Sequence, residues 1–326
     1  MKIASLIVSN FPQAKLNEPL ASKTTFGVGG RALAYLRVKT PEELVATVTL
    51  ARAKKIPYQI IAGGSNVVFV DKLYRGLIIQ YQSTVNKLHH TYHCQGLTLT
   101  VSAGAPLAGL ITSAIKNGLA GLETLSGIPG TVGGAVVGNA GAYGQGISDR
   151  LIAVQVFDPN VQHRMLNIKW ITKEQCKFAY RDSIFKHRNW IVLRAKFVLE
   201  KGDKKALAKK SREIIKVRNK KYAPGLCCPG SFFKNILVSK ISRSALDKID
   251  GSKIIGGKIP AGKLLEEVGA KRMRIGDIFV ADFHGNLLIN GGKGSYADVR
   301  KLAAKLKRKV YNKFKIKLEE EVRFIN

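Results

Sequence analysis

The most informative stretch of the chain is Ser126–Gly146, with the sequence SGIPGTVGGAVVGNAGAYGQG. Glycine lacks a Cβ atom, so each glycine here can adopt positive φ and let the backbone approach a ligand closely. Successive N–H groups of such a backbone form a concavity that binds anions, typically phosphate. Tight turns between buried strands would explain any single glycine. The whole run, with Asn139 and Tyr143 as polar members, favours a phosphate cradle.

A second glycine turn lies upstream, at Gly63–Asn66, between the apolar runs Tyr58–Ala62 and Val67–Val70. This order is strand, tight turn, strand. The segment Gly27–Ala32 formally matches a dinucleotide fingerprint, but that motif needs a strand before it and a helix after it. Because the strand-like run Ala34–Val38 follows it instead, the sequence predicts no Rossmann site.

The chain has 326 residues, and its 54 Lys and Arg against 22 Asp and Glu give a formal net charge of +32. This length allows two or three domains. The basic residues are spread along the chain, and in the predicted helix Tyr296–Lys315 they lie opposite an apolar stripe. A solvated basic face is therefore favoured over a specific nucleic-acid site. Polyanions should still bind non-specifically, with a steep salt dependence.

The cysteine and histidine residues carry little signal. None of the four cysteines lies in a metal-binding spacing. The cluster of His89, His90, His93 and Cys94 lies between short strand-like runs, which favours an exposed hairpin over a metal site. No apolar run reaches about 20 residues, and Ile3–Val8 is too short for the core of a signal peptide. We therefore expect a cytoplasmic protein without membrane insertion and without a metal.

The remaining signals for helices, strands and turns predict an α+β chain. Helices are expected at Pro41–Lys55 and Pro106–Asn117, and strands at Leu97–Ser102, Leu151–Phe157 and Ile191–Leu199. The charged break at residues 201–205 then ends a first unit. A helix over residues 206–220 and a segment rich in Pro and Gly lead into a second unit.

Three polar segments stand out from apolar surroundings: Tyr180–Phe185, Gly230–Asn235 and Glu319–Phe324. Each one alone has an ordinary structural explanation. Arg181 would be ion-paired, Ser231 would cap a helix, and the acidic residues would form a solvated strand edge.

Taken together, the motifs resemble those of the UDP-N-acetylenolpyruvoylglucosamine reductase family, flavoenzymes of peptidoglycan synthesis. They occur in the family's order and span nearly the whole chain. The motifs are AGGSN at 62–66, GIPG at 127–130, NAGAYG at 139–144, YRDSIF at 180–185, GSFFKN at 230–235 and EEEVRF at 319–324.

The resemblance implies an α+β fold with two parts. An FAD-binding domain of the vanillyl-alcohol-oxidase (PCMH) type would occupy residues 1–200, as two subdomains split near residue 57. A substrate-binding α+β domain would occupy residues 201–326. The short connection between Leu199 and Ala206 resembles the shorter subgroup, which lacks a loop that carries a substrate-capping tyrosine.

The cofactor implied by the resemblance is FAD. Some relatives attach the flavin through a histidine after the first glycine pair, but Ser65 stands there, so non-covalent FAD is expected. The implied FAD contacts are Gly63, Gly64, Ser65, Asn66, Gly127, Ile128, Pro129, Gly130, Gly133, Gly134, Asn139, Ala140, Gly141 and Arg218.

The implied reaction adds hydride to the vinyl CH₂ carbon of an enolpyruvyl ether and a proton to the carbon that bears the carboxylate. NADPH would be the reductant, and UDP-N-acetylmuramate the product. By resemblance, Arg181 and Glu321 stabilise charge that develops on the carboxylate, and Ser231 donates the proton.

The implied substrate is a UDP-sugar, contacted by Tyr180, Lys221 and Asn235. The chain departs from the family's pattern in two places. Tyr222–Pro229 replaces the family's usual segment before the serine, and Ile236 replaces a proline after Asn235. The alternative hypothesis is an FAD-dependent alcohol oxidase of the same superfamily, which would need neither the GSFFKN nor the terminal EEEVRF motif.

Overall fold

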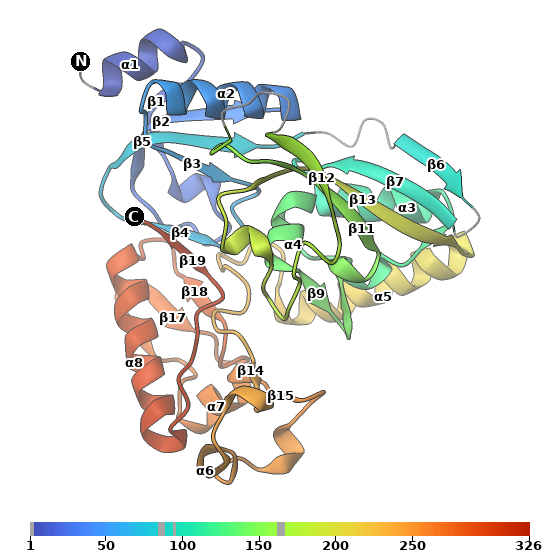
Figure 1. The fold of residues 1–326 in the computed structure, drawn as a ribbon. Helices are drawn as coiled ribbons and strands as arrows, with labels where there is room; N and C mark the ends of the chain where they lie inside the picture. The colour runs from blue at the N-terminus through green and yellow to red at the C-terminus, as the bar shows by residue number, and fades with distance from the viewer. Residues whose placement is uncertain (1–2, 84–88, 94–95, 162–166) are drawn as a thin grey trace. The chain divides into compact units, whose positions relative to one another are not determined.

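The computed structural model of the protein describes residues 3–83, 89–93, 96–161 and 167–326. The chain forms two compact units, each assembled from three separate segments (Figure 1). Unit 1 comprises Met1–Asn17, Leu33–Gly63 and Arg75–Lys220, and unit 2 comprises Glu18–Ala32, Gly64–Tyr74 and Lys221–Asn326.

The first sheet of unit 1 has the strand order β1-β2-β5-β3, with β3 and β5 parallel. Helix α2 begins where the sequence predicts, because Pro41 presets its first turn and Thr40 Oγ1 accepts a hydrogen bond from the Glu43 N–H at 3.1 Å. The elements are α1 (Ile3–Asn10), β1 (Lys15–Pro19), β2 (Arg31–Val38), α2 (Pro41–Ala53), β3 (Tyr58–Ile61) and β5 (Tyr74–Tyr81).

The second sheet of unit 1 is antiparallel, with the order β12-β11-β13-β7-β6, and β8 pairs with the end of β13. Along β13 buried and less buried side chains largely alternate, as in a strand with one face on the core. Its strands are β6 (His89–His93), β7 (Gly96–Ser102), β8 (Leu119–Ala120), β11 (Leu151–Phe157), β12 (Ile168–Thr172) and β13 (Ile191–Lys201). Strands β9 (Gly141–Ala142) and β10 (Gln145–Gly146) form a separate antiparallel pair. The helices are α3 (Leu107–Lys116), α4 (Val132–Gly138) and α5 (Lys204–Lys221).

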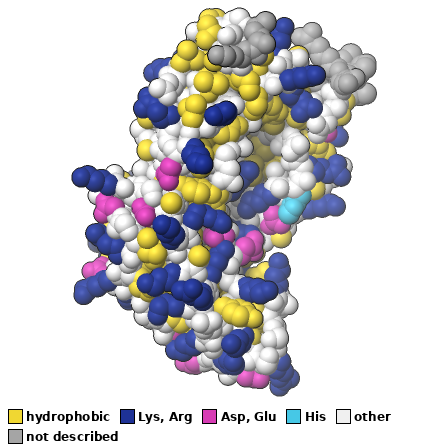
Figure 2. Space-filling view, turned by 90° about the vertical axis from the view of Figure 1, so that its left-hand side faces the viewer, with side chains coloured by type: hydrophobic (Ala, Val, Ile, Leu, Met, Phe, Trp, Pro, Cys, Tyr) yellow, Lys and Arg dark blue, Asp and Glu magenta, His cyan; other side chains and the backbone are white. Residues whose placement is uncertain are grey.

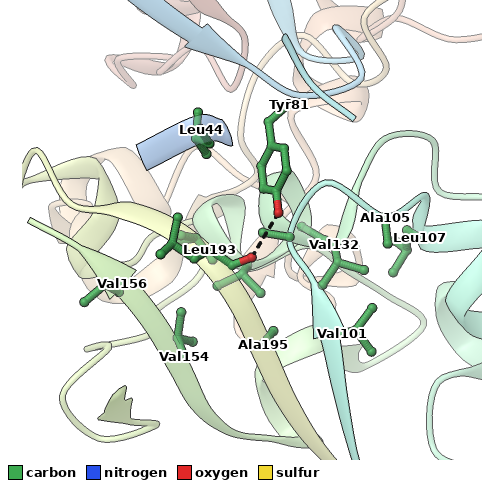
Figure 3. Packing of buried hydrophobic residues seen from close by; sticks show 14 of the residues in the cluster. Leu44, Tyr81, Val101, Ala105, Leu107, Val132, Val154, Val156, Leu193 and Ala195 are labelled. Atoms are coloured by element: carbon green, nitrogen blue, oxygen red, sulfur yellow. Dashed lines mark hydrogen bonds between the residues drawn. The ribbon is translucent and has the colours of Figure 1, made fainter. Parts of the chain in front are cut away.

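One hydrophobic core fills unit 1, and side chains from α2, β7, β11, β13 and α4 meet in it (Figure 3). The Tyr81 hydroxyl is buried in this core, where it lies 2.7 Å from Ser102 Oγ and 3.4 Å from the carbonyl oxygen of Leu193. Burial raises the pKa of Tyr81 to about 12, so it stays neutral and acts as a structural hydrogen-bonding group.

Unit 2 packs α8 against short strands. The capping box of Ser295 and Asp298 starts this helix, and its predicted apolar stripe is buried from Val299 to Phe314. The last strand, β19, pairs in parallel with β4, which directly follows the upstream glycine turn. The elements are β4 (Val67–Phe69), β14 (Ile236–Leu237), α6 (Arg243–Leu246), β15 (Lys258–Ile259), α7 (Ala261–Glu267), β16 (Arg274–Ile275), β17 (Ile278–Val280), β18 (Leu288–Asn290), α8 (Tyr296–Phe314) and β19 (Arg323–Ile325).

The two units do not divide at residue 200. Helix α5 stays with unit 1 up to Lys220, because Leu207 is buried there and Ser211 Oγ lies 2.8 Å from Ser126 Oγ. Unit 2 also takes residues 18–32 and 64–74, which the sequence division assigns to the first domain. Which domain carries which part of the chemistry stays a prediction.

Several local expectations can be compared with the structure. Gly27–Ala32 leads into strand β2 rather than into a helix, as the sequence predicts. His89–His93 forms β6 of a hairpin with β7, and Cys94 lies outside the described residues. Helix α4, inside the glycine run, was not predicted. Within the described parts of the chain, no helix is both long and apolar enough to span a bilayer.

Lys and Arg side chains are spread over the face shown in Figure 2, with acidic side chains between them. In α8 the exposed positions are largely basic and the opposite stripe is buried. This arrangement agrees with the predicted solvated basic face.

Candidate active site

The two predicted glycine turns meet in unit 1. A Cβ atom on Gly63 would lie 3.0 Å from the Cα atom of Gly130, and Gly130 has a φ of +110°. The N–H groups of the neighbouring glycines already make hydrogen bonds within the protein. Gly133 donates to the carbonyl oxygen of Ala103 at 2.7 Å, and Gly134 donates to Thr131 Oγ1 at 3.2 Å. The N–H groups of Gly127 and Gly130 make no hydrogen bond within the described residues, so this end of the run can offer donors to an anion.

Asn139 ends helix α4 in the left-handed conformation, with φ 42° and ψ 58°. Its Nδ2 atom donates to the carbonyl oxygen of Ala179 at 2.8 Å. Its Oδ1 atom is buried, and among the described residues it has no hydrogen-bond partner. A buried acceptor without a partner costs free energy unless a ligand or water donates to it. This oxygen therefore fits a hydrogen-bond donor on a bound cofactor.

Arg181 lies at the third position of a tight turn, and the N–H and C=O groups of Ala179 and Asp182 bond to each other across it at 3.1 Å. Its φ is +55°, in the left-handed region where such turns normally have glycine. Lys186 Nζ donates to the Arg181 carbonyl oxygen at 2.5 Å, and the guanidinium carbon lies 5.7 Å from the centre of the Tyr180 ring. Backbone strain of this kind is typical of functional sites, where a specific side chain is needed.

Two hydrogen bonds attach this turn to the end of α4. One is the bond from Asn139 to Ala179, and the other runs from Ser183 Oγ to the carbonyl oxygen of Val137 at 2.7 Å. Ser183 is almost fully buried. The structure thus brings the predicted residues Asn139, Tyr180 and Arg181 together in unit 1, although 40 positions separate Asn139 from Ala179 in the sequence.

Arg218, an implied FAD contact, lies beside the start of the glycine run. A Cβ atom on Gly127 would lie 3.2 Å from its Cδ atom. Helix α5 is held there by the ion pair between Lys210 and Glu123, 2.8 Å apart. Burial alone would raise the pKa of Glu123, but hydrogen bonds from Lys210 and from the Gly121 N–H outweigh it and leave that pKa below its usual range.

In unit 2, the turn residue Gly64 must be glycine. Its φ is +69°, and a Cβ atom there would lie 1.9 Å from the carbonyl oxygen of Lys23. Asn66 Nδ2 donates to the carbonyl oxygen of Glu321 at 3.0 Å, and the Arg323 N–H donates to the carbonyl oxygen of Asn66 at 3.0 Å. The predicted FAD residue Asn66 therefore also positions the predicted catalytic residue Glu321.

Ser231 and Glu321 lie on two backbone segments that pair with each other. The Glu321 N–H donates to the Phe232 carbonyl oxygen, and the Lys234 N–H donates to the Glu319 carbonyl oxygen, both at 2.9 Å. No helix begins at Ser231; its backbone forms a bridge with Leu287. The helix-cap explanation of this serine is therefore wrong.

Asn286 was missed by sequence reasoning, although it holds the serine loop. Its Nδ2 and Oδ1 atoms bond to the carbonyl oxygen and the N–H of Phe233, both at 2.8 Å, and its own carbonyl oxygen accepts from the Phe232 N–H at 3.0 Å. The side chain is almost fully buried. A single asparagine within a Gly-Asn-Leu stretch gives no signal of this role.

The Ser231 hydroxyl lies 3.0 Å from the hydroxyl of Tyr222, a second residue that sequence reasoning did not place in the site. Lys221 Nζ lies 5.0 Å from the centre of the Tyr222 ring, so this predicted substrate residue is also near the serine loop. Asn235 Oδ1 accepts a hydrogen bond from the N–H of Ala261, at the start of α7, at 3.2 Å. Its oxygen therefore has a structural role.

Two families of domains match the chain. Residues 32–164 match the FAD binding domain, and residues 224–325 match the UDP-N-acetylenolpyruvoylglucosamine reductase C-terminal domain. The UDP-N-acetylenolpyruvoylglucosamine reductase of Solibacter usitatus is 39% identical over 308 residues, which cover 94% of this chain and 95% of that protein. The protein of the same name from Carboxydothermus hydrogenoformans is 35% identical over 306 residues, which cover 94% and 92%.

The solved structures show the same likeness. The crystal structure of UDP-N-acetylenolpyruvylglucosamine reductase (MurB) from Thermus caldophilus superposes with a TM-score of 0.70 at 31% identity, over 96% of this chain and 98% of that one. The predicted fold, an FAD-binding domain followed by a C-terminal α+β domain, is thereby confirmed.

Proposed function

Because the chain belongs to the UDP-N-acetylenolpyruvoylglucosamine reductase family, we propose that Ser231, Arg181 and Glu321 carry that chemistry in this protein. The activity itself is that of the family, a reductase of peptidoglycan precursor synthesis. The proposed substrate is the enolpyruvyl ether of UDP-N-acetylglucosamine, and the proposed product is UDP-N-acetylmuramate.

The residues that would hold FAD fit that cofactor. In unit 1 these are the N–H groups of Gly127 and Gly130 and the buried Oδ1 atom of Asn139. When bound, FAD supplies the hydride that it has accepted from NADPH. A serine hydroxyl does not form the flavin bond that a histidine nitrogen forms, so Ser65 supports non-covalent binding.

Ser231 would donate the proton to the carbon that bears the carboxylate. Serine is a weak acid, but a carbanion-like carbon is basic enough to accept its proton if the geometry is tight. The loop supports such geometry, because the neighbouring Phe232 and Phe233 are buried and their segment pairs with Glu319–Glu321. The backbone of Ser231 is fixed in turn by its bridge to Leu287.

Arg181 and Glu321 would stabilise the negative charge that builds on the substrate carboxylate. A guanidinium offers a planar pair of donors that matches a carboxylate. Asn139 and Ser183 hold the backbone of the strained turn, and the guanidinium carbon lies 5.7 Å from the centre of the Tyr180 ring. A donor that starts from a restrained backbone needs less reorganisation during the reaction. Glu321 would act in its protonated form or through a hydrogen bond.

The UDP part of the substrate would be contacted by Tyr180, Lys221 and Asn235. Lys221 supplies a positive charge suited to a diphosphate.

Membership of the shorter subgroup and a cytoplasmic location also stay predictions.

The observation that carries the proposal is the backbone pairing of the Ser231 loop with Glu319–Glu321 in unit 2. The test is the visible spectrum of the purified protein. We expect flavin absorption that NADPH bleaches without oxygen and that the enolpyruvyl substrate then restores. Oxygen consumption with simple alcohols, and no reoxidation by the enolpyruvyl substrate, would instead support the oxidase hypothesis.

A further inference from the structure

The hydroxyl of Tyr222 is the group that the structure places against the Ser231 hydroxyl, at 3.0 Å. Both side chains are half-buried, and both lie in unit 2. Tyr222 begins the segment in which this chain departs from its family's pattern, so the contact is not a consequence of the shared motifs.

Packing fixes the orientation of the Tyr222 ring. The ring packs on a small apolar cluster that contains Cys228, Ala281, Leu287 and Ile289. Leu287 is also the residue whose backbone bridges to Ser231. The tyrosine and the serine are therefore held by the same part of unit 2, and their contact does not depend on a flexible loop tip.

The direction of this hydrogen bond decides what Ser231 can do. If Ser231 donated to Tyr222, its proton would be engaged and unable to reach a substrate. If Tyr222 donates, the serine proton is free to point at the substrate carbon. The ammonium of Lys221, 5.0 Å from the ring centre, favours the second direction, because a cation over an aromatic ring draws electron density from it and strengthens its O–H as a donor.

We propose that Tyr222 is a positioning residue for Ser231, one that donates a hydrogen bond to the serine oxygen and returns a proton to it. This inference rests on the proposed role of Ser231. As the Ser231 O–H bond breaks, the electron pair of the enolate-like intermediate forms the new C–H bond. The Tyr222 proton then passes to the serine oxygen, and solvent water reprotonates the tyrosine. The net change is one solvent proton added to the substrate carbon.

The first test is Tyr222→Phe, which keeps the ring and removes only the hydroxyl. Flavin reduction by NADPH needs no proton at the substrate carbon, so its rate should stay unchanged. Reoxidation by the enolpyruvyl substrate should slow about 10- to 100-fold, the loss expected for one hydrogen bond to a developing charge. Tyr311→Phe, on α8, is the matched control and should leave both rates unchanged. A Tyr222→Phe protein that reoxidises at the normal rate would overturn the proposal.

The second test combines Tyr222→Phe with Ser231→Ala and follows reoxidation by stopped-flow absorbance. If Tyr222 acts through Ser231, the double variant should reoxidise as slowly as Ser231→Ala alone. If the double variant loses the product of the two single-variant factors, or if Tyr222→Phe also slows flavin reduction, Tyr222 has a general structural role. Either result would also overturn the proposal. Normal reoxidation by Ser231→Ala alone would instead contradict the proposed proton donor itself, so the two failures are distinguishable.

Discussion

Gly63 and Gly130 belong to two glycine turns far apart in the sequence, and a Cβ atom on Gly63 would lie 3.0 Å from the Cα atom of Gly130. The contact is between backbones, which cannot rotate away as a flexible side chain can. The Gly63 turn therefore supports the Gly127–Gly130 end of the glycine run, whose N–H groups we propose to hold FAD.

Gly63→Ala should consequently weaken flavin binding. The added methyl group must displace the Gly130 backbone, and overpacking of this kind costs about 1–3 kcal/mol of stability. We expect a lower urea midpoint and faster loss of flavin on dialysis. Gly251→Ala is the matched control, because no heavy atom lies within 4 Å of a Cβ atom there and its φ is not positive. Equal flavin retention in both variants would contradict the proposed role of this contact.

Arg181 offers a test that separates function from stability. Arg181→Lys keeps a positive charge but loses the planar fork, so turnover should fall by about two orders of magnitude, as when one transition-state donor is removed. Arg181→Gly should abolish turnover yet fold at least as stably, because glycine adopts the observed φ of +55° without strain. Thermal unfolding and steady-state rates of both variants check this. An Arg181→Lys enzyme with normal turnover would support only the ion-pair explanation.

His284 should make unit 2 sensitive to acid. Burial lowers the pKa of His284 to about 4, and the positive charge of Lys221 adds to this effect. Its Nδ1 atom accepts a hydrogen bond from the Asn286 N–H at 3.1 Å, and protonation would break that bond. An unfolded histidine has a pKa of about 6.5, so between that pH and about 4 the unfolded chain binds a proton that the folded chain does not. Stability therefore decreases as the pH is lowered through this range.

The loss assigned to His284 should be on the order of 1–2 kcal/mol after allowance for solvent screening. Urea unfolding at pH 7 and at pH 4.5 measures it. The glutamine in His284→Gln does not titrate, so the stability of this variant should depend less on pH than that of the parent protein. Identical pH dependence of the two proteins would show that His284 does not titrate as described.

FAD should be released completely on denaturation, because Ser65 cannot hold it covalently. Acid precipitation should leave all yellow colour in the supernatant. Flavin fluorescence on the washed and proteolysed pellet would contradict non-covalent binding.

The sequence predicts the glycine turns and the apolar stripe of α8 because both depend on local properties, the missing Cβ atom and the helical period. It does not predict α4, since glycine disfavours helices, and this helix depends on the cap at Thr131 and on the burial of Val132, Ala135 and Val136. Nor does it predict the positive φ of Arg181.

The missed site residues have a different cause. The Asn286 side chain bonds to the backbone of Phe233, 53 positions away. Such contacts depend on the tertiary fold, so no spacing rule along the chain can find them. Tyr222 lies only nine positions from Ser231, but the turn between them, with Gly225 and Gly230 at positive φ, has to be known before their hydroxyl groups can be placed together.

Ser231→Ala tests the centre of the proposed mechanism, because the role of Ser231 belongs to only one half of the reaction. Hydride transfer from NADPH requires no proton at the enolpyruvyl carbon, so the variant should fold, bind FAD and bleach with NADPH at nearly the normal rate. Reoxidation by the substrate should fail or slow severely, since the intermediate cannot be protonated.

A purely structural serine gives the opposite result. Within the described residues, the only side-chain hydrogen bond that Ser231→Ala removes is the one to Tyr222, worth about 0.5–1.5 kcal/mol of stability. Both half-reactions would then stay intact. Stopped-flow absorbance of the flavin, with reduction and reoxidation followed separately, decides between the two outcomes. Normal reoxidation of Ser231→Ala by the enolpyruvyl substrate would remove Ser231 from the mechanism.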